Sequence, residues 1–193
     1  MATVESKPLS LNVYNSAGQE VGKVQIDSAD LGGAINKQLL HEVVLMYLAN
    51  QRAGTHSTKR RGGGTAKGPK PRDYEYHLPK KAVRAALRMA LLSKIQDQQT
   101  VVVDELKFPE IKTKQMTEVL KALNLGGNSC LVGLGAGEVD EHKTVYKSAR
   151  NIIGVEVSPA SQFSAYAVLR PKRLLLTRAA LQELCKNAKW QSV

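Results

Sequence analysis

The chain has 193 residues, 42% of them apolar, and its 28 lysines and arginines against 17 acidic residues give a formal net charge of +11. This length fits one sizeable core rather than two full domains, and the charge predicts a polyanionic partner, with nucleic acid first and an anionic membrane surface second. The start lacks a secretory signal, no run reaches the ~18 apolar residues that span a membrane, and Cys130 and Cys185 lack the spacing of a disulfide framework or a zinc site. We therefore expect a protein of the cytoplasm, or of an organelle matrix, that has no metal or cofactor.

Two short strands are predicted at the N-terminus, over 9–15 and 21–26, because a turn sequence separates two β-prone stretches. From Ile35 the pattern becomes helical and ends near Gly54, with one apolar face formed by Leu39, Val43, Met46 and Tyr47. A second helix opens at Pro79, a residue suited to the first helical position. Its apolar face consists of Val83, Ala86, Leu87, Ala90 and Leu91.

After residue 100, apolar strands alternate with amphipathic helices. Strands are predicted over 101–103, 130–134, 155–157 and 174–176, and helices over 113–123, 141–150 and 177–189, with Trp190 packing the last helix onto the domain. This alternation is typical of βαβ units, in which helices cover both faces of a parallel sheet. We expect a single α/β domain over 1–193, with three layers, a mostly parallel central sheet, an N-terminal hairpin and an extended basic loop.

The loop joins the two long helices and covers residues 54–78. Its 25 residues compare with ~4–6 in an ordinary connection, and a connection of that length indicates a function or disorder. Glycine and proline at 62, 63, 64, 68, 69 and 71 prevent a helix or a strand ladder there, and glycine lets the backbone come close to a partner.

The positive charge of the chain is concentrated in and beside this loop. Residues 52–88 hold eleven cations and two acidic residues, a net charge of +9, which leaves only +2 for the rest of the chain. Guanidinium groups and backbone N–H groups can both reach phosphate oxygens, and the rings of Tyr74, Tyr76 and His77 could stack on splayed bases. A phosphate at the start of the second helix would also offset the charges of the first-turn lysines. The predicted RNA-binding residues are Arg52, His56, Lys59, Arg60, Arg61, Gly62, Gly63, Gly64, Lys67, Lys70, Arg72, Tyr74, Lys80, Lys81, Arg84 and Arg88.

A second pattern points to a different class of protein. The stretch VGLGAGE (132–138) follows a predicted strand and precedes a helix, as does the glycine turn of nucleotide-binding α/β enzymes, and Glu156 falls where a ribose-binding acid is expected. However, the glycines Gly133, Gly135 and Gly137 occupy the first, third and fifth places rather than the first, third and sixth, and Glu138 would repel a pyrophosphate. An enzyme that binds a nucleotide or a methyl donor at this turn is the alternative hypothesis.

Several stretches resemble one known family. QRAGTHSTK (51–59), RGGGTAKGPKPRDYEYHLPKK (61–81) and AVRAALRMAL (82–91) resemble the bacterial form of large-subunit ribosomal protein four, and so do LNVYNSAGQEVG (11–22), SARNI (148–152) and LLLTRAAL (174–181). The resemblance implies an α/β domain on the outer part of the large ribosomal subunit and a long basic loop that penetrates ribosomal RNA. It also implies that the loop tip lines the peptide exit tunnel and that several members repress their own operon by binding its messenger.

The chain departs from this family within the loop. Family members continue after the position of Lys59 through a long glycine- and arginine-rich excursion, whereas here Arg60 leads directly into Arg61, so the loop tip is missing by nature or by design. A 25-residue excursion that doubles back reaches at most about 40 Å, which favours RNA anchoring over tunnel lining. We interpret the chain as a structural constituent of the large subunit and not as an enzyme. Its expected partners are large-subunit ribosomal RNA, neighbouring large-subunit proteins and its own operon messenger.

Overall fold

The computed structural model describes residues 8–59, 62–135 and 139–189; Arg60, Arg61, Gly137, Glu138 and Trp190, which carry some of the predictions above, lie outside them. The elements in chain order are β1 (Pro8–Tyr14), β2 (Glu20–Asp27), α1 (Lys37–Asn50), α2 (Lys80–Gln96), β3 (Thr100–Val103), α3 (Thr113–Ala122), β4 (Cys130–Leu134), α4 (Val139–Ala149), β5 (Val155–Pro159), the 3-10 turn η2 (Ala160–Gln162), α5 (Ala165–Leu169), β6 (Arg173–Thr177) and α6 (Arg178–Lys189).

One mixed sheet joins the strands of the described residues in the order β2-β1-β3-β6-β4-β5. The N-terminal hairpin pairs β1 with β2 in antiparallel fashion, and the other neighbours pair in parallel. β6 comes last in the chain but lies in the middle of the sheet, where Leu174 pairs with Thr100 of β3 and with Leu131 of β4. The predicted hairpin and the mostly parallel sheet are confirmed.

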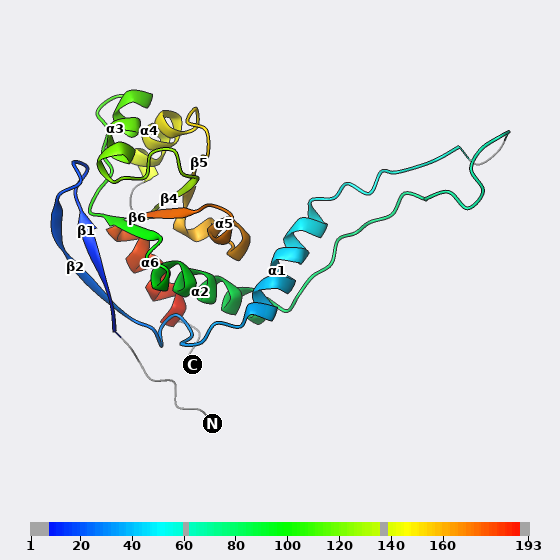
Figure 1. Cartoon of the computed structure of the whole chain (residues 1–193), viewed down its shortest axis with the longest axis horizontal. Coiled ribbons are helices and arrows are strands. Elements are labelled where there is room, and N and C mark those ends of the chain that lie inside the picture. Colours follow the sequence, from blue (N-terminus) through cyan, green and yellow to red (C-terminus); the bar gives the residue numbers. More distant parts are fainter. Residues whose placement is uncertain (1–7, 60–61, 136–138, 190–193) are drawn as a thin grey trace.

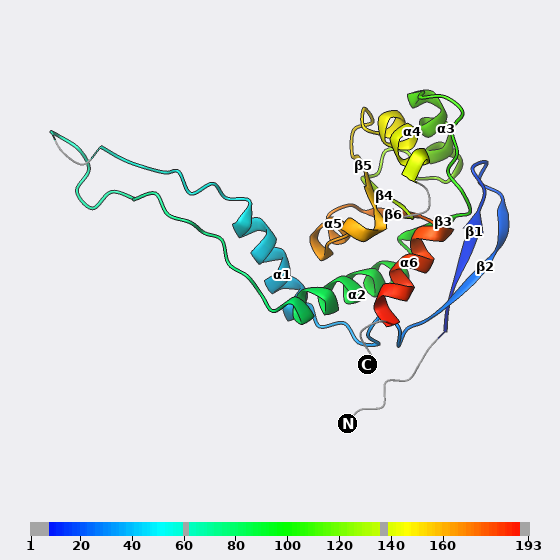
Figure 2. The ribbon, with the colours of Figure 1, turned by 180° about the vertical axis from the view of Figure 1, so that it is seen from behind.

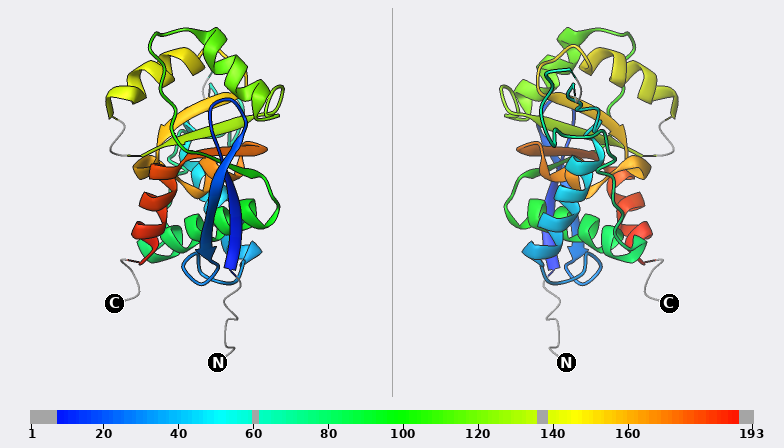
Figure 3. Two further views of the ribbon diagram at one scale, coloured as in Figure 1. Left: turned by 90° about the vertical axis from the view of Figure 1, so that its left-hand side faces the viewer. Right: turned by 90° about the vertical axis from the view of Figure 1, so that its right-hand side faces the viewer.

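Helices cover both faces of this sheet. Successive residues of β6 alternate between the faces, so Leu174 and Leu176 belong to a buried cluster with α1, α2, α5 and α6, whereas Leu175 belongs to a second cluster with α3 and α4. Figure 1 shows α3 and α4 on one side of the sheet and α2 and α6 on the other, and Figure 3 shows the same layers from the two ends. The three-layer α/β architecture is therefore confirmed.

The two cysteines lie in different layers. Cys130 is buried in the cluster with α3 and α4, Cys185 packs against the cluster on the opposite face, and neither forms a disulfide. Burial raises the pKa of the Cys130 thiol to about 12. Cys130 therefore acts as a small apolar side chain.

The basic loop leaves the body between α1 and α2. Both helices lie on the same face of the sheet, and the described residues between them, 51–59 and 62–79, contain no helix or strand. Figures 1 and 2 show the two arms of this connection running side by side away from the body. Pro79 is the N-cap of α2 rather than its first helical residue, a shift of one position from the prediction.

Other features of the fold also differ from the predictions. The short helix α5 and the turn η2 lie between β5 and β6, where no element was predicted. Five residues are too few to show helical periodicity, and α5 is fixed instead by Ser164 Oγ, which accepts a hydrogen bond from Ala167 N at 3.2 Å. In addition, β5 extends two residues beyond the predicted strand. Among the described residues, no helix combines the length and the apolar character needed to cross a membrane.

Candidate nucleic-acid interface

The two arms of the loop meet at Gly54, four residues beyond the end of α1. Arg72 N of the returning arm donates a hydrogen bond to Gly54 O at 3.2 Å. Gly54 has a φ of +66°, and a Cβ at this position would lie 2.0 Å from Arg72 O. Only glycine combines this left-handed backbone with so close an approach, so the sequence fixes a crossing point for the arms here.

Tyr74 lies at this crossing and contacts residues from both arms. The guanidinium carbon Cζ of Arg52 is 4.1 Å from the centroid of its ring, and that of Arg72 is 4.4 Å from it. The His56 ring lies 5.7 Å away at an angle of 47°, and its Nε2 is 3.5 Å from the Tyr74 hydroxyl. The ring is therefore engaged within the protein and is not the open platform for a base that the sequence suggests.

The returning arm is also fastened to α1. Tyr76 N donates a hydrogen bond to Asn50 Oδ1 at 3.1 Å, and the Tyr76 hydroxyl donates to Glu42 O at 3.3 Å. The next ring, His77, lies 3.4 Å from a carboxylate oxygen of Glu75, and both side chains are exposed. These contacts hold the base of the loop against the body.

Further out, the arms approach each other a second time. A Cβ on Gly68 would lie 1.9 Å from Thr58 Oγ1, and Thr65 N donates a hydrogen bond to Lys59 O at 2.9 Å. Gly62 and Gly63 have φ angles of +63° and +83°, which suit the reversal of chain direction in this region. Gly62 and Gly63 thus serve the turn, and Gly68 serves the close approach of the arms.

The cations of the loop face solvent. Lys59, Lys67, Lys70, Arg52 and Arg72 are all exposed, and no carboxylate among the described residues pairs with any of them. Unpaired exposed cations on a narrow projection create a strongly positive local potential. This arrangement suits contacts with phosphate groups, which supply most of the affinity in protein–nucleic acid complexes.

The predicted stripe on α2 continues from the loop toward the body. Lys80, Lys81 and Arg84 are exposed, whereas Arg88 is partly buried and its Nε has no hydrogen-bond partner in the described part of the chain. The start of α2 has no side-chain cap, so its first N–H groups are open to an anion. The outer part of the stripe can therefore extend the basic surface of the loop, and Arg88 lies at its inner limit.

The glycine turn after β4 has a packing role in this structure. A Cβ on Gly133 would lie 2.6 Å from Leu176 Cδ2 and 2.6 Å from Phe163 Cζ, and one on Gly135 would lie 2.8 Å from Ala179 Cβ. These glycines let β4 approach β6 and α6, which explains them without a bound phosphate. Gly137 and Glu138 lie outside the described residues, in which no group of histidine, cysteine and acidic side chains could hold a metal ion.

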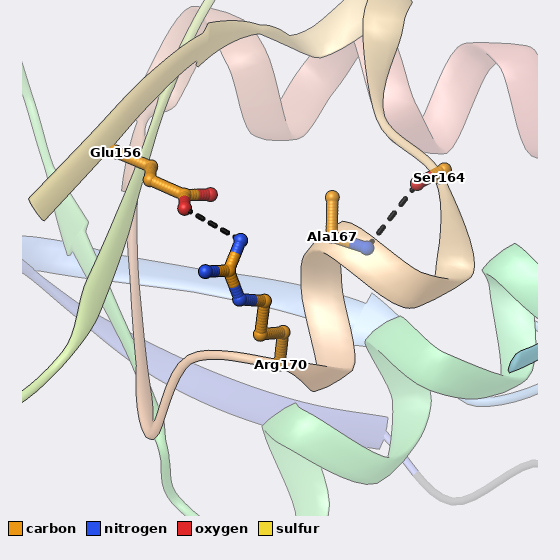
Figure 4. A network of polar contacts seen from close by, with 4 residues as sticks. All are labelled: Glu156, Ser164, Ala167 and Arg170. Atoms are coloured by element: carbon orange, nitrogen blue, oxygen red, sulfur yellow. Dashed lines mark hydrogen bonds and ion pairs between the residues drawn. The ribbon is translucent and has the colours of Figure 1, made fainter. Parts of the chain in front are cut away.

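Glu156 does not occupy the position of a ribose-binding acid. It is the second residue of β5 and pairs with Leu131, near the amino end of the strand, whereas a ribose-binding acid lies at the carboxyl end. Its carboxylate accepts a hydrogen bond from Arg170 Nη1 at 2.9 Å, and Figure 4 shows the two side chains directed toward each other beside α5. The interpretation of Glu156 as a ribose ligand is wrong because β5 is longer than predicted.

Sequence reasoning missed several residues that shape the interface. Asn50, Gly54 and Thr58 help to position the arms but were not among the predicted site residues. Tyr76 was expected only as a ring for a base, and its contacts with α1 were not predicted. Gly54 lies four residues beyond the end of α1, and a glycine in a connection often marks a left-handed backbone, so Gly54 could have been found. The contacts of Asn50 and Tyr76 join residues 26 positions apart, and no local pattern reports them.

Comparison with known proteins gives consistent results. A family model described as "Ribosomal protein L4/L1 family" matches residues 57–187. A protein of Rhodopirellula baltica named "Large ribosomal subunit protein uL4" is 38% identical over 205 aligned residues, which cover 91% of this chain and 90% of the relative. Proteins with the same name from Carboxydothermus hydrogenoformans and Thermoanaerobacter sp. are 40% and 39% identical over 199 residues, and each alignment covers 88% of this chain and 94% of the relative.

Proposed function

Because the chain belongs to the Ribosomal protein L4/L1 family, we propose that it is a structural constituent of the large ribosomal subunit and binds ribosomal RNA through its basic loop and the start of α2. In this proposal residues 1–193 form one domain, and residues 54–78 are its RNA-binding loop. Its partners are large-subunit ribosomal RNA and neighbouring large-subunit proteins, and it acts on the ribosome in the cytoplasm.

The observation that carries this proposal is the position of the unpaired charge. Of the net charge of +11, +9 belongs to residues 52–88, and the described cations of the loop are exposed and without carboxylate partners. Like charges held on a projection repel one another in the free chain. Phosphate groups would remove that repulsion, so the arrangement favours a polyanion as the ligand.

We also propose that the loop is shorter than in the relatives. The alignment with the R. baltica protein is 205 positions long, but it includes only 91% of the 193 residues of this chain, about 176 residues. About 29 positions of the alignment therefore place a residue of the relative opposite a gap in this chain. The direct junction at Arg60 and Arg61 is the place where the sequence departs from its family. A loop of this length would anchor the protein in RNA without lining the exit tunnel.

A structural role is favoured over catalysis. The relatives are named as ribosomal proteins, and the close packing around Gly133 and Gly135 accounts for the glycine pattern that suggested a nucleotide site. Titration of the free protein with adenine cofactors in a calorimeter separates the two hypotheses. We expect no heat of binding, and a saturable heat would support the enzyme hypothesis.

The salt dependence of RNA binding tests the proposal. If six to ten cations contact phosphates, the affinity for ribosomal RNA transcripts should fall by ~10³–10⁵ between 50 and 200 mM salt, by analogy with counterion release from duplex nucleic acid. Filter binding over a series of salt concentrations measures this slope. An affinity that does not change with salt would contradict the proposed phosphate contacts.

A further inference from the structure

We infer that Arg52 and Arg72, held by Tyr74, form a preassembled site for RNA phosphates at the base of the loop. The inference rests on the proposed RNA binding and deepens it, because it assigns one geometric site within a broadly basic surface. Tyr74 is then a positioning residue: it acts through the two arginines and does not stack on a base.

The two guanidinium groups are held close together by contacts from both arms. Their Cζ atoms lie 4.1 and 4.4 Å from the centroid of the Tyr74 ring and therefore within 8.5 Å of each other, the sum of these distances. The hydrogen bond between Arg72 N and Gly54 O fixes the backbone at the same point. The distance between the two guanidinium groups is thus limited before any ligand arrives.

The charges of the pair are unbalanced. Both arginines are exposed, and no carboxylate in the described residues lies within ion-pair distance of either one. The electron-rich face of the ring attracts each cation, but it carries no net charge that could cancel their repulsion. Anions beside them would do so, and two adjacent cations match two successive phosphates of one RNA strand.

The chemistry of arginine suits this geometry better than that of lysine. A guanidinium group is planar, so it can lie over the ring with one face and still direct its N–H donors outward to phosphate oxygens. The lysines farther out, Lys59, Lys67 and Lys70, have no ring contact and act as flexible point charges. We therefore expect oriented contacts at the base of the loop and diffuse electrostatic contacts beyond it.

Substitution of Tyr74 distinguishes oriented phosphate contacts at this site from the general electrostatic attraction between the basic loop and RNA. In Tyr74→Leu, loss of the ring should weaken binding of a ribosomal RNA transcript by ~5–30-fold. The slope of the logarithm of the binding constant against the logarithm of the salt concentration should also fall in magnitude by about one to two. Both effects are expected because oriented phosphate contacts are lost although no charge is removed. Tyr74→Phe keeps the ring and should bind within about twofold of the wild type. Tyr146→Leu is the matched control, since Tyr146 is an exposed tyrosine on α4, outside the loop.

A spectroscopic measurement tests the site without relying on affinity. In the free protein, NMR signals of the Arg52 and Arg72 side chains should carry ring-current shifts that Tyr74→Leu abolishes and Tyr74→Phe preserves. Addition of the transcript should move both signals together. Equal movement on addition of polyglutamate would mean that the pair recognises any polyanion, which would overturn its assignment as a phosphate site.

The remaining outcomes are also decisive. Wild-type affinity in Tyr74→Leu, or an equal loss in Tyr74→Phe, would overturn the inference while leaving the proposed function intact. Failure of the wild-type chain to bind the transcript at all would instead count against the proposed function. If Tyr74→Leu lowers the melting temperature strongly, the test uses the variant Arg72→Lys instead. This variant keeps the positive charge but loses the planar contact with the ring, so we expect the same loss of affinity for the transcript.

Discussion

At the scale of single residues, Gly133 of β4 is closely packed against Leu176 of β6 and against Phe163, which follows η2. The added methyl group of Gly133→Ala would lie 2.6 Å from both Leu176 and Phe163, so this substitution should lower the free energy of unfolding by ~1–3 kcal/mol through overpacking. Gly22→Ala is the control, because nothing lies within 4 Å of its added Cβ. Thermal or urea unfolding measures both variants, and equal stabilities would contradict the packing role.

Lys94 gives a second prediction at this scale, and it concerns pH. Its side chain is 6% exposed, and Nζ donates hydrogen bonds to Gln99 Oε1 and Pro171 O, both at 2.7 Å. These bonds join the end of α2 to the segment before β6. Burial lowers the pKa of Lys94 below its ordinary 10.5; the charge of Asp97 opposes this shift, and that of Arg173 adds to it.

The sign of the pH dependence follows from this shift. In the window between the lowered pKa and 10.5 the unfolded chain binds more protons at Lys94 than the folded chain, so the contribution of Lys94 to stability rises with pH. Relative to a Lys94→Met variant, the wild type should gain unfolding free energy as the pH approaches 10.5. Chemical denaturation at several pH values measures this difference. A difference that shrinks as the pH rises would show that the pKa is not lowered.

At the scale of elements, the sequence predicts what depends on local pattern. The hairpin, the two long helices that flank the loop and the alternation of strands and helices after residue 100 all follow from periodicity and turn residues, and all are present. The helix α5 was missed because its five residues depend on the Ser164 cap and on packing against α1 and α2. The central position of β6 was not predictable either, because strand order depends on long-range pairing.

The candidate site also has features that follow from local sequence and features that depend on long-range contacts. Composition alone locates the cations and the glycines of the loop. The contacts that organise them join Arg52 to Tyr74 and Gly54 to Arg72 across a chain reversal, and no spacing rule relates these positions. Each aromatic ring of the loop was predicted to stack on a base because the sequence does not show its spatial neighbours. In the structure, the guanidinium groups of Arg52 and Arg72 both contact the ring of Tyr74.

The loop itself gives a prediction at this scale. Replacing Arg60, Arg61, Lys67 and Lys70 with glutamine should abolish binding of ribosomal RNA transcripts at moderate salt, because the basic segment loses four of its eleven cations. The melting temperature should stay nearly unchanged, since Lys67 and Lys70 are exposed and form no ion pairs within the described residues. Calorimetric unfolding and filter binding of the same samples measure both effects. A large loss of stability would mean that the segment supports the fold.

At the scale of the whole molecule, charge and packing are segregated. Residues 1–51 and 89–193 hold nearly all of both buried clusters and a net charge of only +2, whereas residues 52–88, the loop and the first half of α2, hold +9. Figure 1 shows the loop extending well clear of the body. A stable body that presents a charged projection is the arrangement expected of a protein that anchors in folded RNA, and the close contacts at Gly54 and Tyr74 hold the projection to its carrier.

Sedimentation of the tagged protein with ribosomal subunits is the sharpest test of whether the loop anchors the chain in ribosomal RNA. In a sucrose gradient of cell lysate at physiological salt, the wild-type chain should travel with the large subunit. The chain in which Arg60, Arg61, Lys67 and Lys70 are glutamine should remain at the top of the gradient although it is folded. Equal co-sedimentation of the two chains, or absence of the wild type from the large-subunit fractions, would contradict the claim that the loop anchors this protein in ribosomal RNA.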